Sequence, residues 1–237
     1  MLDNKSWVLF DMDNTLIDTG PLYLRARDKM ANVIHAELSN VNVTLDDILD
    51  FQDKKDAQLF LKYGYSADRF AESFILTAIH FGVTHLADSV KQIALDVFKQ
   101  ISPPFPTSQN AIENLLGDFN LAIVTAGDYE VQHSRIRKLP FRNLFNDIWI
   151  VDDKTPEVFR SFRRKHALSD DVNHYMIGDS MRSDIIPSLL GGFVPLLIES
   201  PNNWKLVEID GQKLPGNHKL QRFSNALEAT KYIKVNR

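Results

Sequence analysis

The sequence contains no cysteine among its 237 residues. Disulfides, thiolate nucleophiles and cysteine-bound zinc are therefore excluded, and any metal must bind to oxygen or imidazole ligands. Long apolar runs are also missing, because the longest stretches, WVLF and FVPLLI, are far shorter than the roughly 20 residues that span a membrane. The first residues, MLDNKSW, lack the basic segment and apolar core of a secretory signal. We therefore expect a cytoplasmic enzyme or binding protein that does not contact a membrane.

Positive charge is not in excess in this chain. It has 27 Lys and Arg against 31 Asp and Glu, which gives a formal net charge of −4. Proteins that bind nucleic-acid polymers or anionic membranes usually carry clustered basic residues, so neither partner is expected here. The hydrophobic share of 44% and the charged share of 24% are those of a globular protein that can bury a sizeable core.

Short apolar segments recur along the chain and predict the strands of a parallel sheet. They are residues 7–13, 121–128, 147–153, 174–180 and 193–199. Helical patterns lie between them: residues 108–119 have apolar positions at helical spacing, and Thr155 and Pro156 are typical of a helix N-cap and first helical position. This alternation predicts an α/β fold, a Rossmann-like doubly wound parallel sheet.

Residues 21–101 interrupt the alternation, because they contain helical patterns and no convincing strand. Two sets of apolar residues each fall on one helical face: Leu22, Ala26, Met30, Val33, Ile34 and Leu38; and Val90, Ile93, Ala94, Val97, Phe98 and Ile101. Three prolines in ISPPFPTS, residues 101–108, then prevent the helix from continuing. We therefore predict a sheet domain of residues 1–18 and 104–237, with an all-helical cap subdomain of residues 19–103 inserted after the first strand.

Polar side chains follow four of the predicted strands. Asp11 and Asp13 close the first predicted strand, and their spacing of two directs both side chains to the same side. The others are Thr125 after the second strand, Asp152, Asp153 and Lys154 after the third, and Asp179, Ser180 and then Asp184 after the fourth. The carboxyl ends of parallel strands meet at one edge of a sheet, where ligands bind in such folds. We therefore expect these residues to form one site.

A cluster of carboxylates needs a hard cation or a lysine to offset its mutual repulsion. A pair of them can divide the work, one as nucleophile or metal ligand and the other as general acid and base. Glycoside hydrolysis also uses two carboxylates, but normally without a metal cluster or a lysine. Phosphoryl transfer fits better, because it uses Mg²⁺, hydroxyl and amide donors for the phosphate oxygens, and a cation that neutralises developing charge.

Four segments resemble the motifs of the haloacid dehalogenase superfamily, most of whose members are phosphatases. DMDNTLID resembles the first motif, D-x-D-x-T, and LAIVTAGD is similar to the second, a strand that ends in Ser or Thr. DKTPEVF resembles the third, a lysine ahead of a helix, and MIGDSMRSD resembles the fourth, G-D-x-x-x-x-D. The motifs occur in the expected order, and the helical insertion is similar to the cap of one large branch of the superfamily. The resemblance thus covers essentially the whole chain.

The resemblance implies a two-step mechanism for phosphomonoester hydrolysis. Asp11 attacks phosphorus and forms an aspartyl-phosphate, while Asp13 protonates the leaving group and then activates the hydrolytic water. The other implied roles are Mg²⁺ binding by Asp11, Asp13 through its main-chain carbonyl, and Asp179; phosphate binding by Thr125, Ala126 and Lys154; and support behind these residues by Asp184 and Ser180. Relatives that cleave carbon–halogen bonds lack the second aspartate of the first motif, the position of Asp13, so the resemblance argues against dehalogenation.

Two positions depart from the family pattern. Asn14 replaces the commoner glycine, but asparagine is one of the few other residues that tolerate a positive φ. In DKTPEVF, the spacing from the lysine to the phenylalanine is one residue shorter than is usual in the family, which leaves open whether Lys154 is the lysine of the third motif. Lys165 is a poor substitute, because it lies deep in the predicted helix.

The identity of the substrate, the acceptor of the phosphoryl group and the oligomeric state stay open at this point. The expected substrate is a small phosphorylated metabolite, such as a nucleotide, a sugar phosphate or a phosphoglycolate-like acid. Phosphoryl transfer to another hydroxyl, as in a mutase, and a low-turnover phosphate-binding regulatory module are the alternatives. A monomer or a homodimer is expected. The basic segments RIRK (135–138) and RSFRRK (160–165) are interpreted as solvated helix faces.

Overall fold

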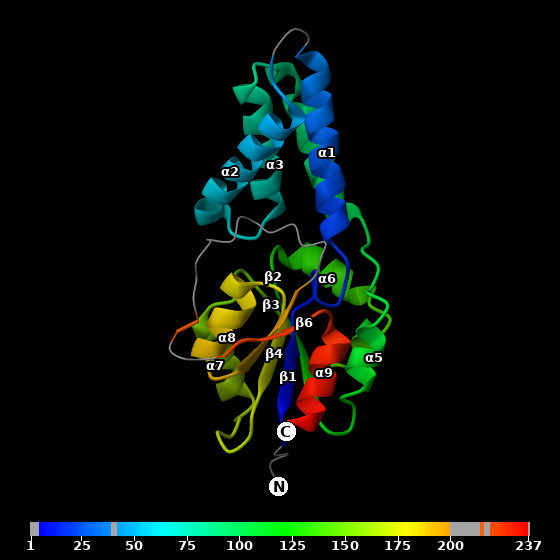
Figure 1. Cartoon of the computed structure of the whole chain (residues 1–237), viewed down its shortest axis with the longest axis vertical. Helices are drawn as coiled ribbons and strands as arrows, with labels where there is room; N and C mark the ends of the chain where they lie inside the picture. The colour runs from blue at the N-terminus through cyan, green and yellow to red at the C-terminus, as the bar shows by residue number, and fades with distance from the viewer. Residues whose placement is uncertain (1–4, 39–41, 200–213, 216–218, 237) are drawn as a thin grey trace. The chain divides into compact units, whose positions relative to one another are not determined.

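The computed structural model describes residues 5–38, 42–199, 214–215 and 219–236. These residues include a six-stranded parallel sheet with the strand order β3-β2-β1-β4-β5-β6 (Figure 1). The strands are β1 (Trp7–Phe10), β2 (Asn120–Ala126), β3 (Asp147–Val151), β4 (Tyr175–Gly178), β5 (Val194–Ile198) and β6 (Gln221–Phe223). The predicted α/β sheet fold is confirmed. The first five strands are shorter than predicted, and β6 was not predicted.

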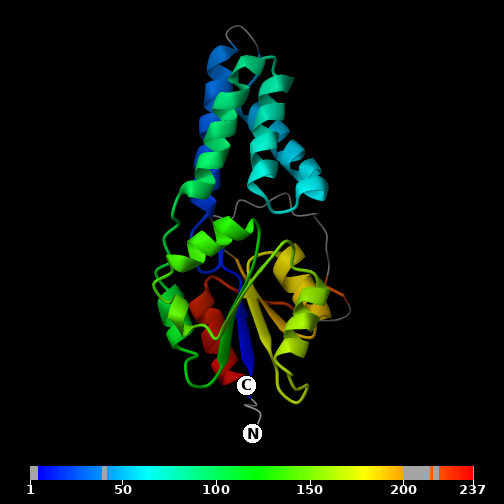
Figure 2. The same cartoon turned by 180° about the vertical axis from the view of Figure 1, so that it is seen from behind.

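The central strands β1 and β4 are buried on both faces, which explains why they are continuously apolar. In β1, Val8 and Phe10 belong to the core on one face, whereas Trp7 and Leu9 belong to the core on the other. Figures 1 and 2 show α5 and α9 on one side of the sheet and α7 and α8 on the other. The helices of this unit are α5 (Ser108–Glu113), α6 (Tyr129–Arg137), α7 (Pro156–Lys165), α8 (Ile186–Leu190) and α9 (Ala226–Val235).

A local signal sets the start of α7, whereas α5 is shorter than its sequence pattern predicts. The Thr155 hydroxyl accepts a hydrogen bond from the Val158 amide, and Pro156 is the first residue of α7, as predicted. The predicted helix over residues 108–119 is shorter in the structure, where α5 ends at Glu113. Gly117 has a φ of 84°, a conformation that favours glycine, but it lies four residues beyond the end of α5.

The segment between β1 and β2 forms a separate helical unit, residues 20–101, which confirms the predicted helical insertion. Its helices are α1 (Gly20–Glu37), α2 (Leu45–Tyr63), α3 (Ala67–His80) and α4 (Ala87–Lys99). Thr44 and Asp47 form a capping box at the start of α2, and the Ser66 hydroxyl caps α3. None of the described helices is long and apolar enough to cross a membrane.

The apolar faces predicted for this unit form its core. Residues buried there from α1 and α4 include Leu22, Ala26, Met30, Ile34, Val90, Ala94 and Val97. Ile101 is 62% exposed because α4 ends at Lys99, two residues before it.

β1 occupies the centre of the sheet, between β2 and β4. The chain builds outward from β1 through β2 to β3, and then returns to the other side of β1 to form β4. The carboxyl ends of β1 and β4 therefore lie where the strand order reverses, which is the usual ligand position in doubly wound sheets.

Candidate active site

The carboxyl end of β1 continues into a tight turn that carries Asp11 and Asp13. The Asp11 amide donates to the Ile177 carbonyl of β4 at 2.9 Å, which fixes this residue beside the neighbouring strand. Asn14 has a φ of 58°, as its residue type permits, and its amide donates to the Ile17 carbonyl at 2.8 Å. Because β1 ends at Phe10, Asp11 and Asp13 lie beyond the strand, and strand alternation does not set the direction of their side chains. Their carboxylates have different partners.

Lys154 lies buried between two carboxylates. Its ammonium donates to Asp11 Oδ1 and, at 2.6 Å, to Asp184 Oδ1, and the whole residue is 3% exposed. The structure therefore brings Lys154 to Asp11 despite the shortened spacing of its motif. Lys165 lies at the far end of α7, where it pairs with Asp147 at 2.7 Å.

Asp184 holds Lys154 from a π-helical turn, Met181–Ile185, that follows β4. Its second oxygen, Oδ2, accepts from the Ser180 amide at 2.9 Å, so both carboxylate oxygens are engaged. Gly178 makes room for this side chain, since a Cβ added to it would lie 2.3 Å from Asp184 Cγ. The glycine of the fourth motif is thus required by the position of the aspartate six residues later.

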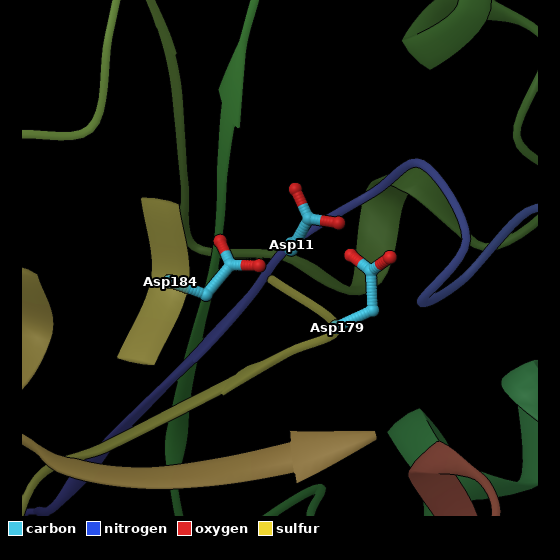
Figure 3. Close-up of side chains that lie close together, drawn as sticks. All are labelled: Asp11, Asp179 and Asp184. Carbon is cyan, nitrogen blue, oxygen red and sulfur yellow. The ribbon is translucent and has the colours of Figure 1, made fainter. Parts of the chain in front are cut away.

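Asp11, Asp179 and Asp184 form a carboxylate cluster. One oxygen from each lies within 4.8 Å of the others. Figure 3 shows that the side chains come from different segments: Asp11 from the segment after β1, Asp179 from the segment after β4 and Asp184 from the helical turn that follows. Oxygen ligands of this kind suit a hard divalent cation such as Mg²⁺. Since both oxygens of Asp184 bind protein donors, Asp11 and Asp179 are the better placed metal ligands of the three.

Burial and mutual repulsion disturb the ionisation of this cluster. Burial is the main cause that raises the pKa of Asp11 to about 7; Lys154 opposes the shift, and Asp184 adds to it. The pKa of Asp179 is also raised, by burial first and then by Asp11 and Asp184. Burial would lower the pKa of Lys154, but Asp11 and Asp184 outweigh it and raise that pKa above its usual value. The site therefore contains one fixed cation, Lys154, and its carboxylates would be further stabilised by a second cation.

Thr125 and Ala126 lie at the carboxyl end of β2. The Thr125 side chain is buried, and its Oγ1 accepts a hydrogen bond from Gln132 Nε2 at 2.6 Å. The Ala126 carbonyl accepts from the same nitrogen at 3.0 Å. The structure thus places both residues of the second motif at the strand edge that also carries Asp11, but it links them to a glutamine that was not predicted.

Asp13 is held by two residues of α6. Gln132 Nε2 donates to Asp13 Oδ2 at 2.8 Å, and Arg135 Nη1 donates to Asp13 Oδ1 at 2.9 Å. The interpretation of RIRK as a solvated helix face is wrong for Arg135, which is only 7% exposed. The sequence did contain a signal, because Gln132, Arg135 and Ile136 share the i, i+3, i+4 spacing of a buried helical face.

The chain is similar to known proteins over nearly all of its length. The family model for haloacid dehalogenase-like hydrolases matches residues 8–189. A haloacid dehalogenase-like family hydrolase from Xanthomonas campestris superposes with a TM-score of 0.78 at 19% identity, covering 98% of this chain and 91% of that one. No curated protein matches the sequence significantly.

Other solved structures share the fold. The putative hydrolase YfnB from Bacillus subtilis, which was solved bound to magnesium, has a TM-score of 0.66 at 18% identity and covers 98% of this chain and 99% of its own. A predicted phosphoglycolate phosphatase from Haemophilus somnus has a TM-score of 0.61 at 12% identity over the full length of both chains. 2-Haloacid dehalogenases match over a similar extent. At these identities the likeness shows the fold alone.

Proposed function

The chain belongs to the haloacid dehalogenase-like hydrolase family, and on that premise we propose that it is a Mg²⁺-dependent phosphomonoester hydrolase that works through an aspartyl-phosphate. Its substrate is a small phosphorylated metabolite. One observation carries the proposal: the buried Lys154 ammonium bridges Asp11 and Asp184 at the edge of the sheet where the Asp11 and Asp179 carboxylates meet. This arrangement gives a nucleophilic carboxylate with positive charge beside it.

In the first proposed step, an oxygen of the Asp11 carboxylate attacks phosphorus in line with the ester bond. The bond between phosphorus and the ester oxygen breaks, its electron pair stays on that oxygen, and Asp13 supplies the proton that makes it an alcohol. Thr125 and the main chain at Ala126 bind phosphate oxygens, and Lys154 offsets their negative charge.

In the second step, Asp13 acts as a base. It takes a proton from water, whose oxygen attacks the phosphorus of the aspartyl-phosphate. The bond between phosphorus and the Asp11 oxygen breaks, its electrons return to Asp11, and inorganic phosphate leaves. Both residues end the cycle as they began it, so the balance requires only ester and water.

The donor set of the site fits Mg²⁺. Asp11 and Asp179 would hold the ion through their carboxylates, and Asp13 through its main-chain carbonyl. When bound, the ion supplies Lewis-acid stabilisation of phosphate charge. Lys154 and Asp184 keep Asp11 in place for that interaction, since Asp184 engages the lysine from the opposite side.

Dehalogenation is the competing reaction within the family. Asp13 favours ester hydrolysis, because a departing alkoxide requires a proton whereas a departing halide does not. Asp13 is also built into a polar network with Gln132 and Arg135, which a site without acid–base chemistry would not need.

The direct test is release of phosphate from p-nitrophenyl phosphate and from a panel of metabolite phosphates, each with and without Mg²⁺. We expect Mg²⁺-dependent hydrolysis that Asp11→Asn abolishes. Asp118→Asn is the matched control, since Asp118 lies before β2 and pairs with Lys234 at 3.3 Å, away from the proposed site. The panel then identifies the leaving group.

Three results would overturn the proposal. They are hydrolysis that does not depend on metal, undiminished hydrolysis by Asp11→Asn, or halide release from a 2-haloacid in place of phosphate release. Mass spectrometry of the quenched reaction tests the intermediate, because a phosphoryl group should be found on Asp11.

A further inference from the structure

We propose that Gln132 and Arg135 are positioning residues that hold the Asp13 carboxylate at a fixed distance and orientation relative to the phosphate-binding end of β2. This inference rests on the proposed function, in which Asp13 exchanges protons with the leaving group and with water. It assigns to α6 a role in catalysis that none of the four sequence motifs contains.

Each of the two carboxylate oxygens of Asp13 accepts a hydrogen bond from a residue of α6. Arg135 Nη1 donates to Oδ1 at 2.9 Å, and Gln132 Nε2 donates to Oδ2 at 2.8 Å. Two contacts on different oxygens fix the rotation of the carboxylate plane, which a single contact would leave free. An ionised carboxylate has about four lone-pair positions. Each oxygen therefore retains capacity to carry the proton that Asp13 exchanges with the leaving group and with water.

Gln132 also links Asp13 to Thr125 and Ala126 of the second motif. Its Nε2 lies 2.6 Å from Thr125 Oγ1 and 3.0 Å from the Ala126 carbonyl, in addition to its contact with Asp13. An amide nitrogen has two hydrogens, so three acceptors share them around one point. The acid–base group and the phosphate-binding hydroxyl are thereby set at a fixed separation, and general acid catalysis depends on such geometry.

Gln132 and Arg135 also contact each other, so they act as one rigid unit. Gln132 and Arg135 are three residues apart on α6, and Arg135 Nη1 also donates to Gln132 Oε1 at 3.3 Å. They are 2% and 7% exposed, respectively. Burying a guanidinium has a large free-energy cost unless an acidic partner lies beside it. Here Asp13 is an acidic partner 122 residues away in the sequence.

The test compares two aryl esters of similar shape. p-Nitrophenolate leaves readily without a proton, whereas phenolate gains much more from protonation during departure. We would measure kcat/KM for p-nitrophenyl phosphate and phenyl phosphate with the wild type, Arg135→Met and Gln132→Met. This parameter covers the steps through leaving-group departure, so slower hydrolysis of the aspartyl-phosphate does not obscure the comparison.

Loss of positioning should weaken proton donation. Of the general-acid contribution of about 10²-fold or more, we expect at least about tenfold to be lost on phenyl phosphate in each variant. The loss on p-nitrophenyl phosphate should be much smaller. Arg135→Lys should recover most of the loss, because it restores a cation that can donate to Asp13.

Matched controls separate this effect from general damage to the helix. Arg137→Met makes the same change at an exposed position two residues along α6, and Gln109→Met does so for glutamine on α5. Both should match the wild type on both esters. Thermal denaturation shows which variants fold; if Arg135→Met does not, Arg135→Lys and Gln132→Met carry the comparison.

The outcomes distinguish this inference from the proposed function. If the wild type hydrolyses neither ester and none of the metabolite phosphates of the panel, the proposed function fails and the inference fails with it. If the wild type is active but the folded variants lose equal factors on both esters, or lose nothing, the positioning role alone is wrong.

Discussion

The ammonium of Lys154 lies 2.6 Å from Asp184 Oδ1, and the missing side chain of Gly178 leaves the space in which that carboxylate stands. The motif glycine and the motif aspartate are therefore one spatial requirement. A change at the glycine should act through the aspartate and then through the lysine on Asp11.

Replacing Gly178 with alanine should displace Asp184 and misplace Lys154. Residues behind a site's ligands typically contribute 10–100-fold, so we expect Gly178→Ala to lower kcat by about that factor. Steady-state kinetics of Gly178→Ala, Asp184→Asn and the double variant give the measurement. If the two changes share a route, the double variant should be hardly worse than Asp184→Asn alone. Independent, multiplying losses would contradict this linkage.

Replacing Lys154 with methionine should leave two carboxylates buried without their cation. Removal of one partner from a buried ion pair destabilises proteins by about 3–5 kcal/mol, and we expect a loss of that size in the free energy of unfolding of Lys154→Met. Urea denaturation without Mg²⁺ measures it. Lys165→Met, at the half-exposed end of α7, is the control and should lose far less. Equal losses would show that the Lys154 bridge adds nothing to stability.

The helical unit has a buried ion pair of its own. Arg69 Nε donates to Asp56 Oδ1 at 2.9 Å, and both side chains are almost fully buried. We expect Asp56→Ala to cost about 3–5 kcal/mol of unfolding free energy, because the guanidinium stays buried without its carboxylate. The double variant Asp56→Leu/Arg69→Met should be more stable than Asp56→Ala. A double variant that is no more stable than Asp56→Ala would argue against coupling.

His174 should make stability depend on pH. Its Nδ1 accepts a hydrogen bond from the Trp7 amide at 3.1 Å, and its Nε2 contacts the Ser169 carbonyl at 3.0 Å. A ring nitrogen that accepts a hydrogen bond carries no proton, so the imidazole of the folded protein is neutral. Burial lowers its pKa below 6.5. The unfolded chain therefore binds the proton more readily, and stability should fall as the pH drops from above 6.5 through the folded pKa.

The melting temperature measured between pH 8 and pH 5 tests this dependence. His174→Gln should flatten the decline below pH 6.5, because it removes the titrating group while keeping an amide donor for Ser169. His35→Asn, at an exposed position on α1, is the control and should keep the wild-type slope. A wild-type slope in His174→Gln would assign the decline to other groups.

Much of the fold could be predicted because its signals are local. The apolar runs of β1 to β5, the cap at Thr155 and the positive φ at Asn14 each depend on residue types within a few positions. Strand ends were less predictable, since the turn after Phe10 is set by hydrogen bonds rather than by polarity. β6 has only three residues, of which the first two are polar, and it is too short for a periodic signal.

The site was predictable to the extent that its residues follow strands. Asp11, Lys154, Asp179 and Asp184 meet because parallel strands end at one edge. The partners of Asp13 come instead from the face of a helix, and whether a basic helix residue is solvated or buried depends on what packs against it. Spacing alone could place Arg135 and Ile136 on a shared face, but it could not identify an aspartate 122 residues away as the partner.

The central position of β1 also has a consequence for the order in which the protein can assemble. β1 is made first, but its neighbour β2 begins only at Asn120, after the whole helical unit, and the lysine that contacts Asp11 follows 143 residues after it. During synthesis, the strand that precedes Asp11 has no neighbouring strand to pair with until β2 has been made. Closing so long a loop is slow compared with forming local helices. The helical unit should therefore fold first, and Asp11 should meet its partners only in the last stage of folding.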